Sequence, residues 1–314
     1  MAEFQLSPDD VFLRRDLIAA GLTDRDVRRR VVAGDLTRLR HGAYVPTELV
    51  KEFGEVDMGR ARARAVLRTA HPTAVLSHQT ALAEHGVDTW GVGFDETHLT
   101  RTDGRPGRRE SGVVHHRATL GRRWWVARNG VPVTHPARAA IEVTTAYGAE
   151  AGLVAACGVL NRELATAAEL HEVAQEAMRW PGSLGTRLVL ARADPRLTNV
   201  AEARVWHLFF EQGITRPEPQ VEVRDAQGNL LGIVDFAWRA CGVFLEFDGR
   251  IKYELHRRPG ESLADYLMRE KRREEQICLE KGWICIRITW ADLQRPAVLA
   301  RRIRKALESR TYVG

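Results

Sequence analysis

Apolar and polar positions alternate most clearly in the last third of the chain. Residues 230–238 and 243–247 are mostly apolar runs on either side of Cys241-Gly242, a pattern typical of two antiparallel strands joined by a tight turn. The other elements of this region are predicted at 220–224 and 283–289 for strands, and at 199–212, 262–281 and about 296–308 for helices. The resulting order is αβββαβ, in which the last strand crosses over in parallel after its helix.

The first 46 residues predict two helices and a two-stranded hairpin. Ser7-Pro8 is a helix start, and its apolar stripe, which ends at Gly21, comprises Phe12, Leu13, Leu17 and Ile18. Thr23 and Asp26 have the spacing of a capping box for a second helix over about 24–33. The strands of the hairpin are expected at 36–40 and 43–45.

A linker is expected at 47–60, followed by a middle region with both helices and short strands. Its helices are predicted at 61–70, 75–86, 135–147, 149–160 and 166–179, and its strands at 96–100, 112–116 and 131–134. We therefore expect a multidomain chain of the α+β or α/β class. Its expected domains are 1–50, 61–190 and 198–314.

Composition narrows the functional classes. The net charge of +6 and the pI near 9.4 fit a polyanionic partner such as nucleic acid. The sequence has no apolar run of about 18 residues and no secretory pattern at its start, so we expect a cytoplasmic protein without a membrane span. The four cysteines lack C-x-x-C spacing and are expected to be reduced core residues.

Three carboxylates lie on the two best-defined strands. Asp235 is in the first strand, and Glu246 and Asp248 are at the end of the second. Because alternate strand residues face the same way, Glu246 and Asp248 are expected on one face, roughly 6.6 Å apart at about 3.3 Å per residue. Clustered carboxylates repel unless a cation or a shared proton relieves them. Hard oxygen donors in this arrangement suit Mg²⁺ or Mn²⁺.

The segments Val234-Asp235-Phe236, Leu245-Glu246-Phe247-Asp248-Gly249 and Trp283-Ile284-Cys285-Ile286-Arg287 resemble the PD-(D/E)XK nuclease superfamily, in the branch of the very-short-patch-repair endonucleases. The resemblance covers about the last 115 residues and implies a restriction-endonuclease-like core. It implies metal ligation by Asp235, Glu246 and the backbone carbonyl of Phe247, with Glu202 on the preceding helix as a further catalytic carboxylate.

One position departs from that family. The E-x-K lysine, two residues after the glutamate, is replaced here by Asp248. Asp248 could instead hold a second ion or accept a proton, and Lys252 is a candidate to replace the missing lysine. Lys252 could equally be an ordinary exposed lysine. In the helix at 262–281, Arg269, Arg272 and Arg273 either follow the DNA path or form a solvated charged face.

The N-terminal order of helix, turn, basic helix and hairpin is that of a winged helix-turn-helix. The runs Arg15-Asp-Leu-Ile-Ala-Ala-Gly-Leu-Thr23 and Gly34-Asp-Leu-Thr-Arg-Leu-Arg-His-Gly-Ala-Tyr-Val45 resemble AbiEi-type antitoxins, and the middle region has an order similar to their second domain. The resemblance implies DNA binding and a protein partner encoded nearby. Candidate DNA contacts are Arg25, Arg28 and Arg29 on the helix, and Arg38 and Arg40 on the hairpin.

The middle region is rich in histidine. His78 and His85 are seven residues apart on one predicted helix, too far to share an ion, and the adjacent His115 and His116 face opposite ways. We therefore expect hydrogen-bonded histidines here and no metal site.

Two functions follow from these patterns. The first is a Mg²⁺- or Mn²⁺-dependent DNA endonuclease guided by a winged helix, in phage defence or DNA repair. The alternative is an AbiEi-type transcriptional regulator whose nuclease-like domain is inert.

Overall fold

The structure is a computed structural model that describes residues 4, 6–103, 107–248 and 260–311. These residues form a mixed α+β chain with three separate sheets, and the chain divides into two compact units, Met1–Ala193 and Asp194–Gly314. Within the described ranges, no helix combines the length and the apolar character needed to cross a membrane.

The first unit begins with a small three-stranded antiparallel sheet in the order β1-β3-β2. Its elements are η1 (Pro8–Asp10), β1 (Phe12–Leu13), α1 (Arg14–Ala19), α2 (Asp24–Ala33), β2 (Leu36–Arg40), β3 (Ala43–Pro46) and η2 (Thr47–Leu49). The capping box of α2 is confirmed: Thr23 Oγ1 accepts from the Asp26 amide, and Asp26 accepts from the Thr23 amide. Gly34, at φ +83°, ends this helix in the left-handed region, as glycine allows.

The prediction of one continuous helix from Ser7 to Gly21 is wrong. Ser7 caps only the 3₁₀ turn η1, and Phe12 and Leu13 pair with Tyr44 and Ala43 of β3. Leu13 is buried, whereas Ile18, which was expected on the same apolar stripe, is 38% exposed. Pairing with a strand about 30 residues further along the chain therefore overrides the local helical spacing.

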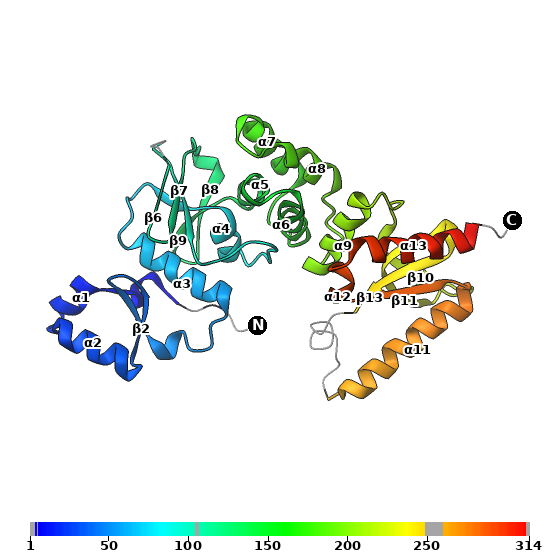
Figure 1. Cartoon of the computed structure of the whole chain (residues 1–314), viewed down its shortest axis with the longest axis horizontal. Coiled ribbons are helices and arrows are strands. Elements are labelled where there is room, and N and C mark those ends of the chain that lie inside the picture. The colour runs from blue at the N-terminus through cyan, green and yellow to red at the C-terminus, as the bar shows by residue number, and fades with distance from the viewer. Residues whose placement is uncertain (1–3, 5, 104–106, 249–259, 312–314) are drawn as a thin grey trace. The chain divides into compact units, whose positions relative to one another are not determined.

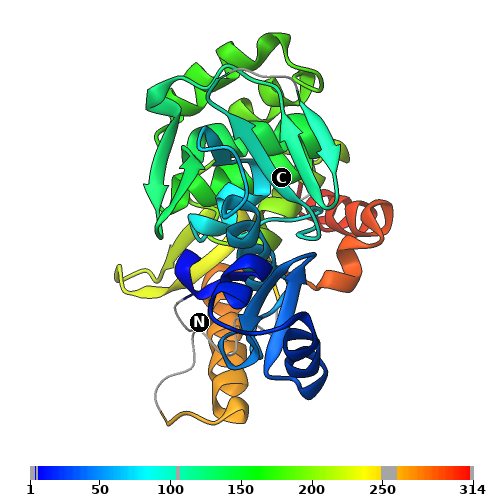
Figure 2. The ribbon, with the colours of Figure 1, turned by 90° about the vertical axis from the view of Figure 1, so that its left-hand side faces the viewer.

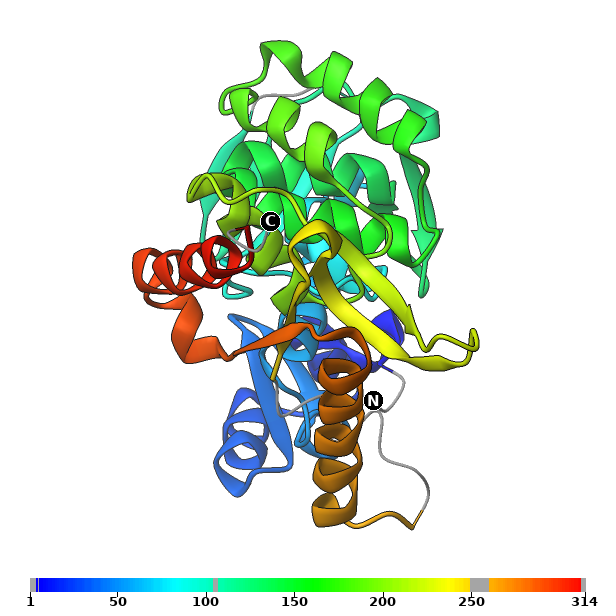
Figure 3. The same cartoon turned by 90° about the vertical axis from the view of Figure 1, so that its right-hand side faces the viewer.

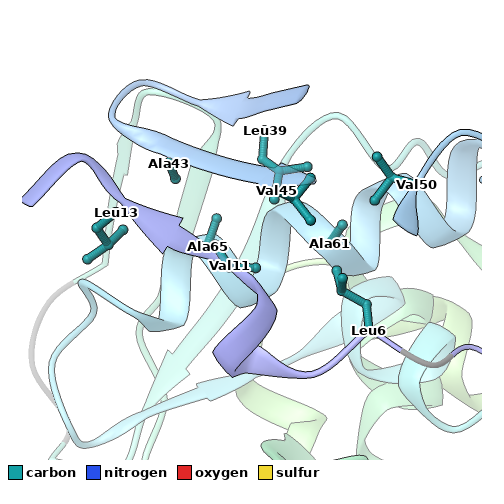
Figure 4. Packing of buried hydrophobic residues seen from close by; sticks show 9 residues of the cluster. All are labelled: Leu6, Val11, Leu13, Leu39, Ala43, Val45, Val50, Ala61 and Ala65. Atoms are coloured by element: carbon teal, nitrogen blue, oxygen red, sulfur yellow. The ribbon is translucent and has the colours of Figure 1, made fainter. Parts of the chain in front are cut away.

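The segment expected as a linker contains the start of helix α3 (Glu55–Leu67). Ala61 and Ala65 of α3 pack into an apolar cluster with Leu6, Val11 and Val45 (Figure 4). The helix also contacts helix α4 (His78–Glu84) and strand β5 (Thr97–Arg101). The apolar alanines of α3 thus continue the core of the N-terminal part beyond the predicted boundary.

The larger sheet of the first unit has six strands in the order β6-β7-β5-β4-β9-β8 (Figure 2). Its strands are β4 (Ala74–Leu76), β5 (Thr97–Arg101), β6 (Arg108–Glu110), β7 (Val113–His116), β8 (Trp125–Arg128) and β9 (Val131–Thr134). The helical elements are α4 (His78–Glu84), η3 (Arg122–Trp124), α5 (Pro136–Tyr147), α6 (Ala149–Asn161), α7 (Ala167–Glu176), η4 (Ala177–Arg179) and α8 (Leu184–Arg192). Sequence patterns did not predict β6, β8 or α8, and the helix predicted at 75–86 is wrong at its start, because Val75 and Leu76 belong to strand β4.

The second unit contains the predicted αβββαβ order. Its elements are α9 (Val200–Glu211), β10 (Glu218–Arg224), β11 (Leu230–Trp238), η5 (Arg239–Cys241), β12 (Val243–Phe247), α11 (Leu263–Lys281), β13 (Ile284–Ile288), α12 (Trp290–Leu293) and α13 (Pro296–Thr311). The sheet order is β10-β11-β12-β13, with antiparallel neighbours except for the parallel pair β12–β13, as expected.

This sheet lies between α11 on one face and α9 with α13 on the other (Figures 1 and 3). Trp206 of α9 stacks on Phe236 of β11 and Phe209 meets it edge to face, with ring centroids 5.8 and 5.2 Å away. On the opposite face, Phe244 belongs to a cluster with Ile277 of α11. Because strand residues alternate between faces, Glu246 of β12 lies on the same face as Phe244, beneath α11.

Candidate functional site

Asp235 and Glu246 are buried on neighbouring strands of the second unit. Only 7% of Asp235 and 6% of Glu246 is exposed. The Phe247 amide of β12 donates to Asp235 Oδ2 at 2.7 Å, so this carboxylate reaches across from β11. Glu246 lies opposite Arg287 of β13 in the parallel register. The two carboxylates therefore lie on adjacent strands, Glu246 near the end of β12 and Asp235 within β11, and Asp235 acts on the charge of Glu246.

Two arginines lie beside Glu246, and one of them also lies near Asp248. Arg273 of α11 donates from Nη2 to Glu246 Oε1 at 2.6 Å and lies 3.0 Å from Glu270 Oε2. Arg287 Nη2 is 3.7 Å from Glu246 Oε2, and its Nη1 is 3.7 Å from Asp248 Oδ2. Its Nε donates to Glu274 at 2.5 Å. Glu246 thus makes one close ion pair, with Arg273, and one longer one, with Arg287.

Burial outweighs the effect of these two arginines on the pKa of Glu246. Burial raises the pKa of Glu246, and the nearby Asp235 raises it further, while Arg273 and Arg287 act in the opposite direction. The net pKa of this carboxyl is above its ordinary value, so its charged form is disfavoured in the fold. A bound cation would offset the cost of burying the charged form of Glu246. This carboxylate is therefore suited to be a metal ligand.

A pocket of about 350 Å³ opens beside these residues, and it is lined by Glu246, Phe247, Asp248, Tyr266, Leu267, Glu270, Lys271, Arg273, Glu274 and Arg287. One donor atom each of Glu246, Glu274 and Cys285 also lies within 4.8 Å of the others. Burial raises the pKa of the Cys285 thiol, so the thiolate form that binds metals is suppressed. The donors that remain are carboxylate oxygens, which fit Mg²⁺ or Mn²⁺.

The other predicted catalytic residues have different surroundings. Asp248 lines the pocket and has 30% of its side chain exposed. Glu202 is buried at the start of α9, where it accepts from the Thr198 amide at 2.8 Å and Asn199 Nδ2 at 2.6 Å. It is not one of the described residues that line the pocket. Lys252 lies outside the described residues.

Sequence patterns had not identified Arg287, Glu270 or Glu274 as part of this site. The sequence does contain one indication for Arg287. It is a charged residue inside a predicted strand whose other residues are mostly apolar. Helical spacing alone does not show that Arg273, rather than Arg269 or Arg272, reaches Glu246.

The arginines proposed to bind DNA lie on α2 and the β2–β3 hairpin. Arg25, Arg28 and Arg29 of α2 are exposed, and Arg29 pairs with Asp26 at 2.7 Å. Arg38 is exposed but folds onto the hairpin, where Nη2 lies 3.0 Å from His41 Nδ1. Arg40 is half-buried. The three arginines of α2 therefore form the more accessible basic surface.

Comparison with known families gives one relationship, at the N-terminal end. Residues 2–47 match a family described as "Transcriptional regulator, AbiEi antitoxin". No curated protein matches the chain. The matched residues contain α1, α2 and the β2–β3 hairpin, so this segment is similar to the N-terminal domain of AbiEi-type regulators. The match ends before the second unit and does not bear on the carboxylate site.

Proposed function

We propose that this chain is a DNA-binding protein of the AbiEi regulator type whose second unit is a metal-dependent endonuclease. The observation that supports the enzymatic part most strongly is the burial of Asp235 and Glu246 on neighbouring strands, with Glu246 and Asp248 on the wall of a pocket. Charged side chains are rarely buried without a compensating partner or a function. Burial keeps the pKa of Glu246 raised even with Arg273 and Arg287 beside it.

DNA binding is assigned to the N-terminal part as a winged helix. In this proposal α2 is the recognition helix, with Arg25, Arg28 and Arg29 toward the DNA, and Arg38 and Arg40 of the hairpin reach the backbone. Arginine suits phosphate and guanine contacts because its planar guanidinium donates several hydrogen bonds at once. The AbiEi relationship of residues 2–47 supports this assignment.

In the second unit, Asp235, Glu246 and the Phe247 carbonyl would hold Mg²⁺ or Mn²⁺. When bound, such an ion lowers the pKa of water and offsets charge on the phosphate. Asp248, on the pocket wall, can accept a proton from the attacking water, while Arg287 offers positive charge to the phosphodiester. Glu202 would bind the ion through water or orient the attacking water, and Lys252 is the candidate to assist the leaving group.

Arg273 has to release Glu246 for that carboxylate to bind an ion. It has an alternative partner, because Glu270 Oε2 lies only 3.0 Å from the same Nη2 atom. The guanidinium can therefore leave Glu246 without losing its compensation. It would remain in the pocket as a cation for the scissile phosphate, at a site where the family's E-x-K lysine is missing.

A second candidate function is a regulator with an inert second unit. It is favoured by Asp248 in place of the E-x-K lysine and by the Arg273–Glu246 ion pair, which already neutralises one metal ligand. In this case the N-terminal part would bind an operator, and a protein partner encoded nearby would complete an antitoxin system.

A cleavage assay separates the two functions. The full chain is incubated with supercoiled plasmid and with single-stranded DNA, in Mg²⁺ or Mn²⁺ and in EDTA. We expect metal-dependent cleavage that is lost in Asp235→Asn and Glu246→Gln but retained in Glu280→Gln, an exposed acid of α11. Absence of cleavage in the wild type would favour the regulator, and equal cleavage in all variants would mean that the site is wrongly assigned.

A further inference from the structure

Three histidines that are distant in sequence meet in the first unit. One ring nitrogen each of His78, His98 and His116 lies within 4.8 Å of the other two. His116 Nε2 is 2.9 Å from His98 Nδ1, and the ring of His78 stacks on that of His116 with centroids 3.7 Å apart. The cluster is well enclosed, since His78 and His98 are each only 5% exposed.

The fold brings the three together through neighbouring strands. In the parallel pair β5–β7, His98 lies opposite Val114 and Thr100 opposite His116, so both histidines are on one face of the sheet. His78 follows β4, where the Ser77 amide donates to the His98 carbonyl at 2.9 Å. His78 has φ +56°, a left-handed conformation that residues other than glycine rarely adopt. Such backbone strain is found preferentially at functional sites.

A second layer of polar groups orients the rings. Ser77 Oγ lies 3.0 Å from His78 Nδ1, and the Tyr147 hydroxyl lies 3.3 Å from His98 Nε2. That hydroxyl is itself bonded by Gln79 Nε2 at 2.7 Å. Each of these two imidazoles thus has one nitrogen engaged by an outer group and another available for the cluster. This is the arrangement that metal-binding histidines show with their supporting residues.

The imidazoles are in the form that binds metals. Burial lowers the pKa of His98 to about 4 and that of His116 to about 3, and burial lowers the pKa of His78 as well. At neutral pH all three rings are therefore neutral, and each has a nitrogen lone pair.

We propose that His78, His98 and His116 form a binding site for a divalent transition metal, with Zn²⁺ as the best-fitting ion. Three imidazoles suit Zn²⁺, Co²⁺ or Ni²⁺ better than Mg²⁺ or Mn²⁺. Two nitrogens on a tetrahedral zinc ion are about 3.3 Å apart, given bonds of about 2.0–2.1 Å. The 2.9 Å between His98 and His116 needs to widen slightly, and the His78 ring, which is stacked on His116 at 22°, has to turn so that its lone pair points at the same ion. Three protein ligands leave a fourth position for water or a small ligand, as in catalytic zinc sites.

The test is zinc binding to the full chain after removal of metals by a chelator. Calorimetry with Zn²⁺ and the visible spectrum with Co²⁺ are recorded for the wild type and for His116→Gln. The matched control is His115→Gln, the neighbouring residue, which is also half-buried but faces the other side of β7. We expect one tight site in the wild type and in the control, and an affinity at least about 100-fold lower in His116→Gln.

Two further variants make the result decisive. Ser77→Ala leaves all three ligands in place and is expected to weaken Zn²⁺ binding by about 10- to 100-fold through loss of the outer partner of His78. Glu246→Gln, in the second unit, is expected to leave this site unchanged. Circular dichroism checks that each variant is folded. The proposal is overturned if the wild type does not bind Zn²⁺ at micromolar concentration, or if folded His116→Gln and Ser77→Ala both bind it as tightly as the wild type.

Discussion

The histidine cluster of the first unit and the carboxylate site of the second bury titratable groups by different means. His78, His98 and His116 are buried as neutral rings that contact one another. Asp235 and Glu246 are buried carboxylic side chains. Glu246 is bonded to Arg273 of α11, the helix that covers this face of the sheet. Neutral nitrogen donors need no counter-charge and select transition metals, whereas clustered carboxylates need a cation and select hard ions. On these grounds the two proposed sites would take different ions.

A buried ion pair elsewhere in the first unit has a purely structural role. Arg64 and Glu84 of the first unit are paired with no exposure of either side chain, and Arg64 Nε donates to the Leu6 carbonyl at 2.8 Å. Asn129 adds a bond from Nδ2 to the Glu84 carbonyl at 3.0 Å. In contrast to Arg273, which borders an open pocket, Arg64 is fully enclosed by its partners.

The largest effect is expected from breaking that enclosed pair. Arg64→Ala leaves the buried Glu84 charge without its main partner and should lower the free energy of unfolding of the first unit by about 3–5 kcal/mol. Denaturant titration of the full chain measures it. Arg62→Ala, on the same helix with 32% of its side chain exposed and a longer contact to Asp95, should cost at most about 1 kcal/mol. Equal losses in the two variants would contradict a special role for the buried pair.

A smaller effect is expected when the positive charge of Arg273 is removed from the proposed nuclease site. Arg273→Gln should lower the cleavage rate at saturating DNA by about 100-fold, as for loss of one donor that stabilises a transition state. Arg272→Gln removes an exposed charge from the next position of α11 and should leave that rate nearly unchanged. A faster Arg273→Gln enzyme would indicate that the Arg273–Glu246 pair inhibits the site instead.

Weakened DNA binding should follow from changes on α2. Arg28→Ala and Arg29→Ala should each lower affinity by a few-fold to about 10-fold and reduce the salt dependence by roughly one unit per lost phosphate contact. Arg187→Ala, which removes an exposed charge from α8, is the matched control. Titrations at several salt concentrations measure both quantities, and unchanged slopes in both α2 variants would place the DNA surface elsewhere.

The smallest effect concerns the pH dependence of stability. Burial raises the pKa of Glu84, but hydrogen bonds and charges from Arg64, Arg60 and Asn129 outweigh it, so the net pKa is below the ordinary value of 4.5. The stabilisation from this carboxylate is therefore present above pH 4.5 and is lost as the pH falls toward the lower folded value. Thermal unfolding should depend less steeply on pH in this range in Glu84→Gln than in the wild type or in Glu48→Gln. An unchanged slope would argue against this linkage.

The sequence predicts features whose signals are local. Strand β11 and strand β12 are bounded by turn residues, and their predicted limits agree with the structure. Alternation along β12 also predicts that Glu246 and Asp248 face the same side, and both line the pocket. The short strand Phe12–Leu13 was predicted as helix, because its partner β3 lies far along the chain.

Contacts between distant segments explain what was missed at the two sites. Arg273 reaches Glu246 from a helix 27 residues further along the chain, and its charged neighbours give no indication of which side chain faces the sheet. The histidine cluster draws one residue from each of three segments, so the tests of spacing applied to pairs within one segment did not detect it.

The most direct test of this account is Mn²⁺ binding followed by electron paramagnetic resonance in the full chain, because it probes the second unit without depending on the correct DNA substrate. The wild type and His116→Gln should each bind Mn²⁺ at millimolar concentration, whereas Glu246→Gln and Asp235→Asn should not. Glu280→Gln should behave as the wild type. Mn²⁺ binding that persists in the folded Glu246→Gln and Asp235→Asn variants, or that is lost in His116→Gln, would contradict the assignment of Asp235 and Glu246 as the ligands of a hard divalent ion.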